Sequence, residues 1–264
     1  MNLTDSVSQW AALQGIGKKP RTRDYHQEVI GYLLAHWPDD PLADVAGVTD
    51  QVLTDFVLRV APLSASRFNA LVCVLRATVP AAKKLKRRPL RLKDRPLLSQ
   101  LEFSRLLEEL DKRPRSHAGL VIRFLAHTGL RINEARQVRW SDVLADRIVI
   151  PGATTKNGHP RTIPFVNGIA ATLDELRKLG DGVRVLPQDE AKRSLATACD
   201  RAGVPKLTHH DFRHLFATRC IQSGVDIPTV ARWLGHRDGG ALLAKTYYHL
   251  ADEHSLAMAA RVRL

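Results

Sequence analysis

The sequence predicts a mainly α-helical protein with a small antiparallel β-sheet, divided into two domains. Amphipathic segments with helix-capping residues recur along the chain, and only two short segments have the composition of strands. A dense basic run separates the two halves. The 264 residues, 44% of them hydrophobic, are enough for two cores. We therefore expect a helical domain at residues 1–82, a basic linker at 83–96, and a domain with helices and strands at 97–264.

The first domain is expected to consist of short helices separated by turns. Residues 22–37 are amphipathic, and the Pro-Asp-Asp-Pro segment at 38–41 ends that helix. A second helix is expected at 49–60, and a third begins at a cap formed by Ser64 or Ser66. The alternation typical of strands is absent from the sequence here, so the domain should be all helical.

The chain carries 40 Lys and Arg against 27 Asp and Glu, a formal charge of +13. Such an excess favours a polyanionic partner, nucleic acid ahead of an acidic membrane. The cations are densest at 83–96, where an ordinary solvated strap is the alternative to a linker that lies against a phosphate backbone. The residues of this run expected to contact DNA are Lys83, Lys84, Lys86, Arg87, Arg88, Arg91 and Lys93.

Capping and turn signals organise the second domain. Ser99, with Glu102 at the third helical position, predicts its first helix. An apolar helix is expected at 117–127, ended by Thr128-Gly129. The expected strands are 147–150 and 161–166, and the Asn-Gly pair between them predicts a hairpin turn with Lys156 at its lip. Helices are expected again near 170–179 and 192–202.

The segment 208–214 combines a helix start with residues suited to chemistry. Thr208 followed by Asp211 predicts a capping box, and on the helix that follows, His210 and Arg213 share a face. His210 and His214 have the spacing of a zinc site, but Asp211 stands where the zinc-protease motif needs glutamate. We therefore expect no metal.

Further candidates lie at 131–134 and beyond 226. Arg131 and Glu134 are one helical turn apart, which suits either a structural ion pair or a guanidinium held for a phosphate. A helix capped by Asp226 should deliver His236 at its end. Arginines, imidazoles and the phenol of Tyr247 or its neighbour can together neutralise, hydrogen-bond and attack a phosphate.

Cysteine usage and the N-terminus favour a cytoplasmic protein. Cys73, Cys199 and Cys220 are widely spaced and form no Cys-x-x-Cys motif, as is typical of reduced thiols. The first residues have the composition of neither a signal peptide nor a membrane span. We expect no membrane association and no separate DNA-binding module before residue 20.

Five motifs in order carry a resemblance to a known family. They are TGLRINE at 128–134, a lysine in a β-hairpin at 156, HDFRH at 210–214, LGH at 234–236, and Tyr-x-His at 247–249. In these motifs the chain resembles the tyrosine recombinases, also called phage integrases. The resemblance implies a helical core-binding domain and an α+β catalytic domain that together clamp duplex DNA.

The resemblance also implies roles for individual residues. Arg131 and Arg213 would bind the non-bridging oxygens of the scissile phosphate, with Glu134 supporting Arg131. Tyr247 would attack, leaving a 3′-phosphotyrosyl enzyme and a free 5′-hydroxyl. The general acid, the base or hydrogen-bond partner, and the further phosphate ligand would be Lys156, His210 and His236, respectively. Two more residues of the hairpin expected to contact DNA are His159 and Arg161.

The position of the tyrosine departs from the usual pattern. In most family members it lies nine residues after the LGH histidine, a position held here by Lys245. A two-residue insertion within 237–240 would bring Tyr247 into register, and Tyr248 is the rival nucleophile.

The resemblance implies a tetramer on paired sites of double-stranded DNA and strand exchange through a Holliday junction, without metal, ATP or another cofactor. A type IB topoisomerase and a DNA-binding regulator without catalysis are the alternatives. Residues 252–264 are expected to form a helix that docks on a neighbouring protomer or folds back on its own domain.

Overall fold

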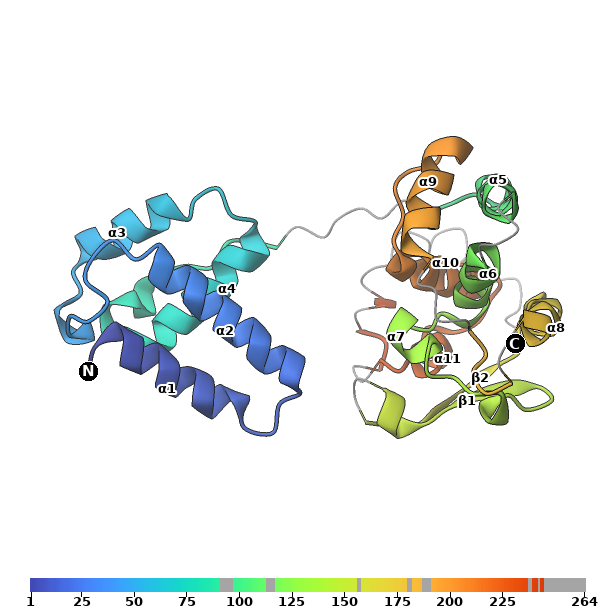
Figure 1. Cartoon of the computed structure of the whole chain (residues 1–264), viewed down its shortest axis with the longest axis horizontal. Coiled ribbons are helices and arrows are strands. Elements are labelled where there is room, and N and C mark those ends of the chain that lie inside the picture. The colour runs from blue at the N-terminus through green and yellow to red at the C-terminus, as the bar shows by residue number, and fades with distance from the viewer. Residues whose placement is uncertain are drawn as a thin grey trace, which may run out of the picture. The chain divides into compact units, whose positions relative to one another are not determined.

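The computed structural model describes residues 1–90, 97–112, 117–155, 158–179, 182–186, 191–236, 239–241 and 243–244. The chain divides into two compact units, Met1–Lys93 and Asp94–Leu264 (Figure 1). The first unit has one hydrophobic core, whereas the second has a main core and a smaller one under its last helices. The boundary between the units falls within the segment expected to be a linker.

The first unit is helical throughout its described residues. α1, α2 and α4 pack on one another around leucines and aromatic side chains, among them Leu33, Phe56 and Leu71. Ser64, and not Ser66, caps α4 by accepting from the backbone N–H of Arg67. The elements are α1 (Leu3–Gly15), α2 (Pro20–Ala35), η1 (Val45–Gly47), α3 (Asp50–Arg59), α4 (Ala65–Thr78) and η2 (Pro80–Lys84).

Two helices of the first unit, α1 and α2, differ from expectation. α2 begins at Pro20, before the expected residue 22, because proline suits the first turn of a helix. α1 lies outside the helices expected from periodicity. Asn2 caps it by accepting from the Asp5 N–H, and residues 3, 7 and 11 bury one face of it.

Residues 83–90 lie within the first unit, whereas the sequence assigned them to the linker. Asn69 and Arg88 exchange two hydrogen bonds, of 2.8 Å from the Asn69 amide to the Arg88 carbonyl and 2.7 Å from the Arg88 N–H to the Asn69 oxygen. The Arg88 guanidinium lies 3.8 Å from the ring centre of Phe68. It also donates to two carbonyl groups between α3 and α4, those of Ala61 and Leu63. Arg88 therefore anchors the basic run to the first unit.

The neighbouring cations of the run have a different environment. Lys83, Lys84, Lys86 and Arg87 are exposed, and Lys84 forms an ion pair with Asp50. The other two candidates of this run, Arg91 and Lys93, lie outside the described residues.

The second unit surrounds α6 with helices and adds a two-stranded sheet. α6 packs against α5, α8 and α10, which leaves its apolar residues buried. The elements are α5 (Gln100–Asp111), α6 (Ala118–Thr128), α7 (Ile132–Ala135), η3 (Trp140–Asp142), β1 (Arg147–Ile150), η4 (Gly152–Thr154), β2 (Arg161–Pro164), α8 (Ile169–Leu179), α9 (Lys192–Ala202), α10 (His209–Gln222) and α11 (Ile227–Leu234).

The hairpin and the capping boxes confirm the local predictions. β1 and β2 are antiparallel, with Ile148 opposite Ile163 and Ile150 opposite Arg161. β2 ends at Pro164, two residues earlier than expected. Capping boxes begin α5 at Ser99 and α10 at Thr208. None of the described helices is long and apolar enough to span a bilayer.

Two helix ends meet where the candidate site lies. α6 ends at Gly129, whose φ of +63° is the left-handed conformation that favours glycine. α11 ends in the same way at Gly235, with φ of +71°. The core between α10 and α11 contains Phe216 and Leu234, and both side chains lie directly beside Gly129. The chain segments after α6 and after α11 are thereby brought together.

Candidate active site

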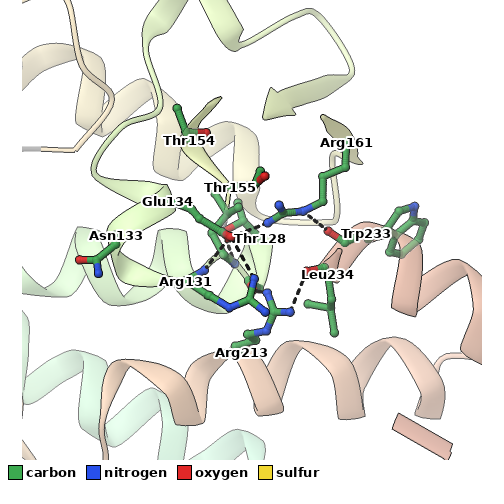
Figure 2. A network of polar contacts seen from close by, with 12 residues as sticks. Thr128, Arg131, Asn133, Glu134, Thr154, Thr155, Arg161, Arg213, Trp233 and Leu234 are labelled. Atoms are coloured by element: carbon green, nitrogen blue, oxygen red, sulfur yellow. Dashed lines mark hydrogen bonds and ion pairs between the residues drawn. The ribbon is translucent and has the colours of Figure 1, made fainter. Parts of the chain in front are cut away.

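Glu134 is the centre of a buried polar network (Figure 2). Its side chain is 3% exposed and accepts hydrogen bonds on both carboxylate oxygens. Arg131 donates from Nη1 to Oε1 at 2.9 Å and from its backbone N–H to Oε2 at 3.2 Å. Arg161 donates from Nη2 to Oε2 at 2.7 Å. One carboxylate therefore holds two guanidinium groups, that of Arg131 at the N-cap of α7 and that of Arg161 in β2.

Arg161 is buried, whereas the sequence suggested that it contacts DNA. Its side chain is 6% exposed, and besides Glu134 it donates from Nε to the backbone carbonyl of Trp233 at 2.8 Å. Two of its N–H groups are thus committed to other parts of the protein. The structure shows Arg161 as a bridge between β2, α7 and the end of α11.

Arg213 is buried on α10, with 3% exposure. Its guanidinium donates from Nη1 to the Gly129 carbonyl at 2.9 Å and from Nη2 to the Leu234 carbonyl at 2.7 Å. These carbonyls belong to the C-terminal ends of α6 and α11, where the helix dipoles favour a cation. Arg213 therefore joins two helix ends that lie far apart in the sequence.

The histidines of α10 lie at its start. His210 is exposed, and its ring stands edge-on to that of His214 with 4.8 Å between the ring centres. His210 and Arg213 were expected to share a face of this helix, but they differ in burial, since His210 is exposed and Arg213 is buried. Among the described residues, no group of three or more metal-ligating side chains is assembled.

A pocket opens beside the Glu134 network, between the hairpin and α11. Its polar lining combines three predicted residue sets, from the TGLRINE segment, the hairpin and the LGH turn. Thr155 lies in its wall, with its hydroxyl within hydrogen-bond distance of the carbonyls of Gly152 and His159. Polar residues that line the pocket are Arg131, Glu134, Thr155, His159, Arg161, Arg232 and His236.

Arg232 is a pocket residue that the sequence reasoning missed. It is exposed on α11, four residues before His236, and lines the pocket together with Arg131. The sequence did contain a signal for this role: Arg232 is a cation on the polar face of a strongly amphipathic helix, one turn before the LGH histidine. Its position adds positive charge at the mouth of the pocket.

Three candidates for the catalytic chemistry lie outside the described part of the chain. They are Lys156, Tyr247 and Tyr248. Lys156 falls between two described residues of the hairpin, Thr155 and Gly158. Gly158 has the positive φ of a turn. The expected helix at 252–264 is outside the described residues as well.

The charges of the network favour an anion. Burial raises the pKa of the Glu134 carboxyl, but the hydrogen bond and charge of Arg161, together with Arg131, hold that pKa below its ordinary value of 4.5. Glu134 is therefore ionised at neutral pH. Two guanidinium groups against one carboxylate leave an excess of one positive charge in this network, and Arg232 adds another cation to the pocket lining. A phosphodiester placed in the pocket would reduce that excess.

The stability of the second unit should depend on this carboxylate in a defined pH range. Because the folded-state pKa of Glu134 is lowered, its ion pairs contribute fully above pH 4.5 and are lost as the pH falls through the folded-state value. We expect Glu134→Gln to lower the free energy of unfolding by about 3 kcal/mol at pH 7. Urea unfolding at several pH values should show that the difference from wild type shrinks below pH 4.5. The exposed Glu175→Gln is the control, and a difference that stays constant to pH 3 would contradict the assignment.

Comparison with solved structures identifies the fold. The chain matches a lambda integrase dimer bound to a COC′ core site with a TM-score of 0.77 and 16% identity, over 90% of this chain and 96% of that one. It matches the Tn1549 transposon integrase in complex with transposon right end DNA with a TM-score of 0.79 and 17% identity, over 99% of each chain. These matches confirm the mainly α-helical fold with a small sheet.

Comparison with curated proteins gives relatives by sequence. The tyrosine recombinase XerA of Saccharolobus solfataricus is 30% identical over 151 residues, which are 56% of this chain and 50% of that protein. The integrase of Escherichia phage 186 is 27% identical over 173 residues, 63% of this chain and 48% of that protein. The chain thus spans about half the length of the curated relatives it matches.

A family model covers both the candidate site and most of the second unit. It is the model of the phage integrase family, and it matches residues 96–254, more than half of the chain. The matched range includes every predicted catalytic residue, from Arg131 to Tyr247. The chain therefore belongs to the phage integrase family, the tyrosine recombinases.

Proposed function

We propose that the protein is a site-specific DNA recombinase that cleaves and rejoins duplex DNA through a 3′-phosphotyrosyl intermediate. The observation that carries this proposal is the cationic network beside one pocket: Arg131 and Arg161 on Glu134, with Arg213 at the two helix ends. Membership of the phage integrase family supports it.

The arginines meet the first requirement of the reaction. A phosphodiester anion repels an oxygen nucleophile, and the developing charge on phosphorus needs fixed cations. Arg131, with its side chain 32% exposed at the pocket, would donate to one non-bridging oxygen. Arg213 would stabilise the other from the end of α6. Because protein contacts already orient both side chains, little reorganisation accompanies binding.

The tyrosine and lysine would carry the bond changes. The Tyr247 oxygen attacks phosphorus and loses its proton to a nearby imidazole, with His210 or His236 as the candidate acceptor. The bond from phosphorus to the 5′ oxygen breaks, and Lys156 gives a proton to that oxygen. The products are a 3′-phosphotyrosyl ester and a free 5′-hydroxyl. The reverse sequence with another 5′-hydroxyl rejoins the DNA.

The proposal extends to DNA contacts and assembly. Lys83, Lys84, Lys86 and Arg87, exposed beside the Arg88 anchor, would contact the phosphate backbone. Tetramer formation on paired sites and passage through a Holliday junction are also proposed. A lambda integrase tetramer bound to a Holliday junction, with a TM-score of 0.73 to this chain, supports that step. The reaction would take place on DNA in the cytoplasm.

The test is a covalent-adduct assay. Duplex DNA nicked beside the cleavage point traps the phosphotyrosyl protein because the short 5′-hydroxyl strand diffuses away. Sites would come from the DNA flanking the gene and from a randomised library, with EDTA present. We expect an adduct with wild type and with Tyr248→Phe, and none with Tyr247→Phe, because phenylalanine lacks the attacking oxygen.

The other outcomes identify the alternatives. Loss of the adduct only in Tyr248→Phe would make that residue the nucleophile and reject the two-residue shift of register. Failure of wild type to form an adduct with any library member, despite tight DNA binding, would reject recombination in favour of a DNA-binding regulator. An adduct accompanied by relaxation of supercoiled DNA as a monomer, without strand exchange, would favour a topoisomerase.

A further inference from the structure

Arg161 joins three segments that each carry a residue of the candidate site. It is the first residue of β2, in the hairpin that bears Lys156. Its Nη2 donates to Glu134, 27 residues earlier, and its Nε donates to the carbonyl of Trp233, 72 residues later (Figure 2). At 6% exposure, this guanidinium is placed by internal bonds and not by solvent.

The bond to Glu134 fixes Arg131. The Arg131 side chain is 32% exposed, so packing alone leaves it rotamer freedom. Its Nη1 is held by Oε1 of Glu134, while Oε2 of the same carboxylate is held by Arg161. Without Arg161, Oε2 would keep only the 3.2 Å bond from the Arg131 backbone N–H, and the carboxylate could shift together with the Arg131 side chain. Arg161 thus limits the motion of Arg131, which lines the pocket.

The bond to Trp233 fixes the turn that delivers His236. The Trp233 carbonyl lies in the last turn of α11, where carbonyls lack intrahelical partners. A Cβ on Gly235 would lie 3.1 Å from Cδ, 3.2 Å from Nη1 and 3.3 Å from Nε of Arg161. The guanidinium therefore rests directly on the Gly235 backbone, and the residue after that glycine is His236. The end of α11 is built around this side chain.

We propose that Arg161 is a positioning residue for DNA cleavage: it sets Arg131 through Glu134 and His236 through the Trp233–Gly235 turn. The inference rests on the proposed recombinase function. The guanidinium acts through these two protein partners and does not itself bind the scissile phosphate.

The experiment separates binding from chemistry. Arg161→Gln and Arg161→Lys would be compared with wild type for DNA affinity at several salt concentrations and for the single-turnover rate of adduct formation at saturating protein. We expect both variants to lose about 100-fold in rate, because misplacement of about 1 Å has effects of that size. Lysine at position 161 should not restore the cleavage rate, since one ammonium cannot reproduce the two hydrogen bonds that the planar guanidinium donates to Glu134 and Trp233. DNA affinity and its salt dependence should remain those of wild type.

A double-mutant comparison tests the route through Glu134. If Arg161 acts partly through that carboxylate, Arg161→Gln should slow cleavage less in a Glu134→Gln background than in wild type.

Arg147→Gln is the matched control for Arg161→Gln, because Arg147 lies at the other end of the same hairpin and pairs with exposed Asp146. It should leave the rate unchanged. If Arg161→Gln does not fold, Arg161→Lys, which keeps a cation beside Glu134, carries the test.

Distinct results would overturn the inference. A salt slope smaller by about 0.9 would indicate a lost phosphate contact, and Arg161 would then bind DNA directly. A wild-type rate in folded Arg161→Gln, or full rescue by lysine, would leave only a structural or charge role. Fully additive losses with Glu134→Gln would reject the route through that carboxylate. Absence of an adduct with wild type itself would instead reject the proposed function.

Discussion

Replacement of Arg213 by alanine is expected to abolish detectable adduct formation and to destabilise the protein by about 3–5 kcal/mol. The side chain is 3% exposed, and its removal leaves the Gly129 and Leu234 carbonyls without these donors at two helix ends. Buried carbonyls without donors are costly. The same change removes a cation from the proposed phosphate site. Urea unfolding and the adduct assay measure the two effects.

Arg213→Lys separates the structural role from the chemical one. Lysine keeps the charge, but a single ammonium cannot hold two carbonyls and a phosphate in the geometry of a guanidinium fork. We expect a folded protein with a cleavage rate at least about 100-fold below wild type. Arg219→Lys is the matched control, since Arg219 lies on the same helix with its guanidinium 5.8 Å from the Phe103 ring centre. Cleavage by Arg213→Lys at the wild-type rate would contradict a role in phosphate binding.

Local signals were sufficient to predict most helices and the hairpin. The Ser99 and Thr208 capping boxes begin α5 and α10, and α9 has the expected bounds. The basic run shows where such signals fail. Its composition indicated a linker, but Arg88 within it is held by Asn69 and by carbonyls between α3 and α4. Those contacts join residues 19 to 27 positions apart, and no local pattern encodes them.

In the candidate site as well, a contact between residues close in sequence was predicted, and a contact between distant elements was not. The spacing of Arg131 and Glu134 predicted their ion pair, because residues three apart share a helical face. It did not predict that Glu134 also binds Arg161, which lies on a different element. Nor did spacing predict that Arg213 is buried while the Arg131 side chain remains 32% exposed. Burial of a charge depends on which helix ends converge on it, and that is a property of the assembled fold.

Substitution of Gly129 is expected to have the second large effect. Gly129 ends α6 at φ of +63°, and an added Cβ would lie 2.5 Å from Cδ1 of Phe216 and 2.7 Å from Cδ2 of Leu234. The left-handed conformation and the overpacking together should lower the free energy of unfolding by about 3 kcal/mol or more in Gly129→Ala. Urea unfolding measures this loss.

Gly203→Ala is the matched control because it isolates the steric part. Gly203 ends α9 at φ of +65°, almost the same conformation, but nothing lies within 4 Å of its added Cβ. This variant should lose only about 1 kcal/mol and cleave DNA at the wild-type rate. In Gly129→Ala the carbonyl that holds Arg213 must move with Phe216 and Leu234, so cleavage should fall even where the protein is fully folded. Equal losses of stability in the two variants would show that the core relaxes around residue 129, and an unchanged cleavage rate would show that Arg213 does not need this helix end.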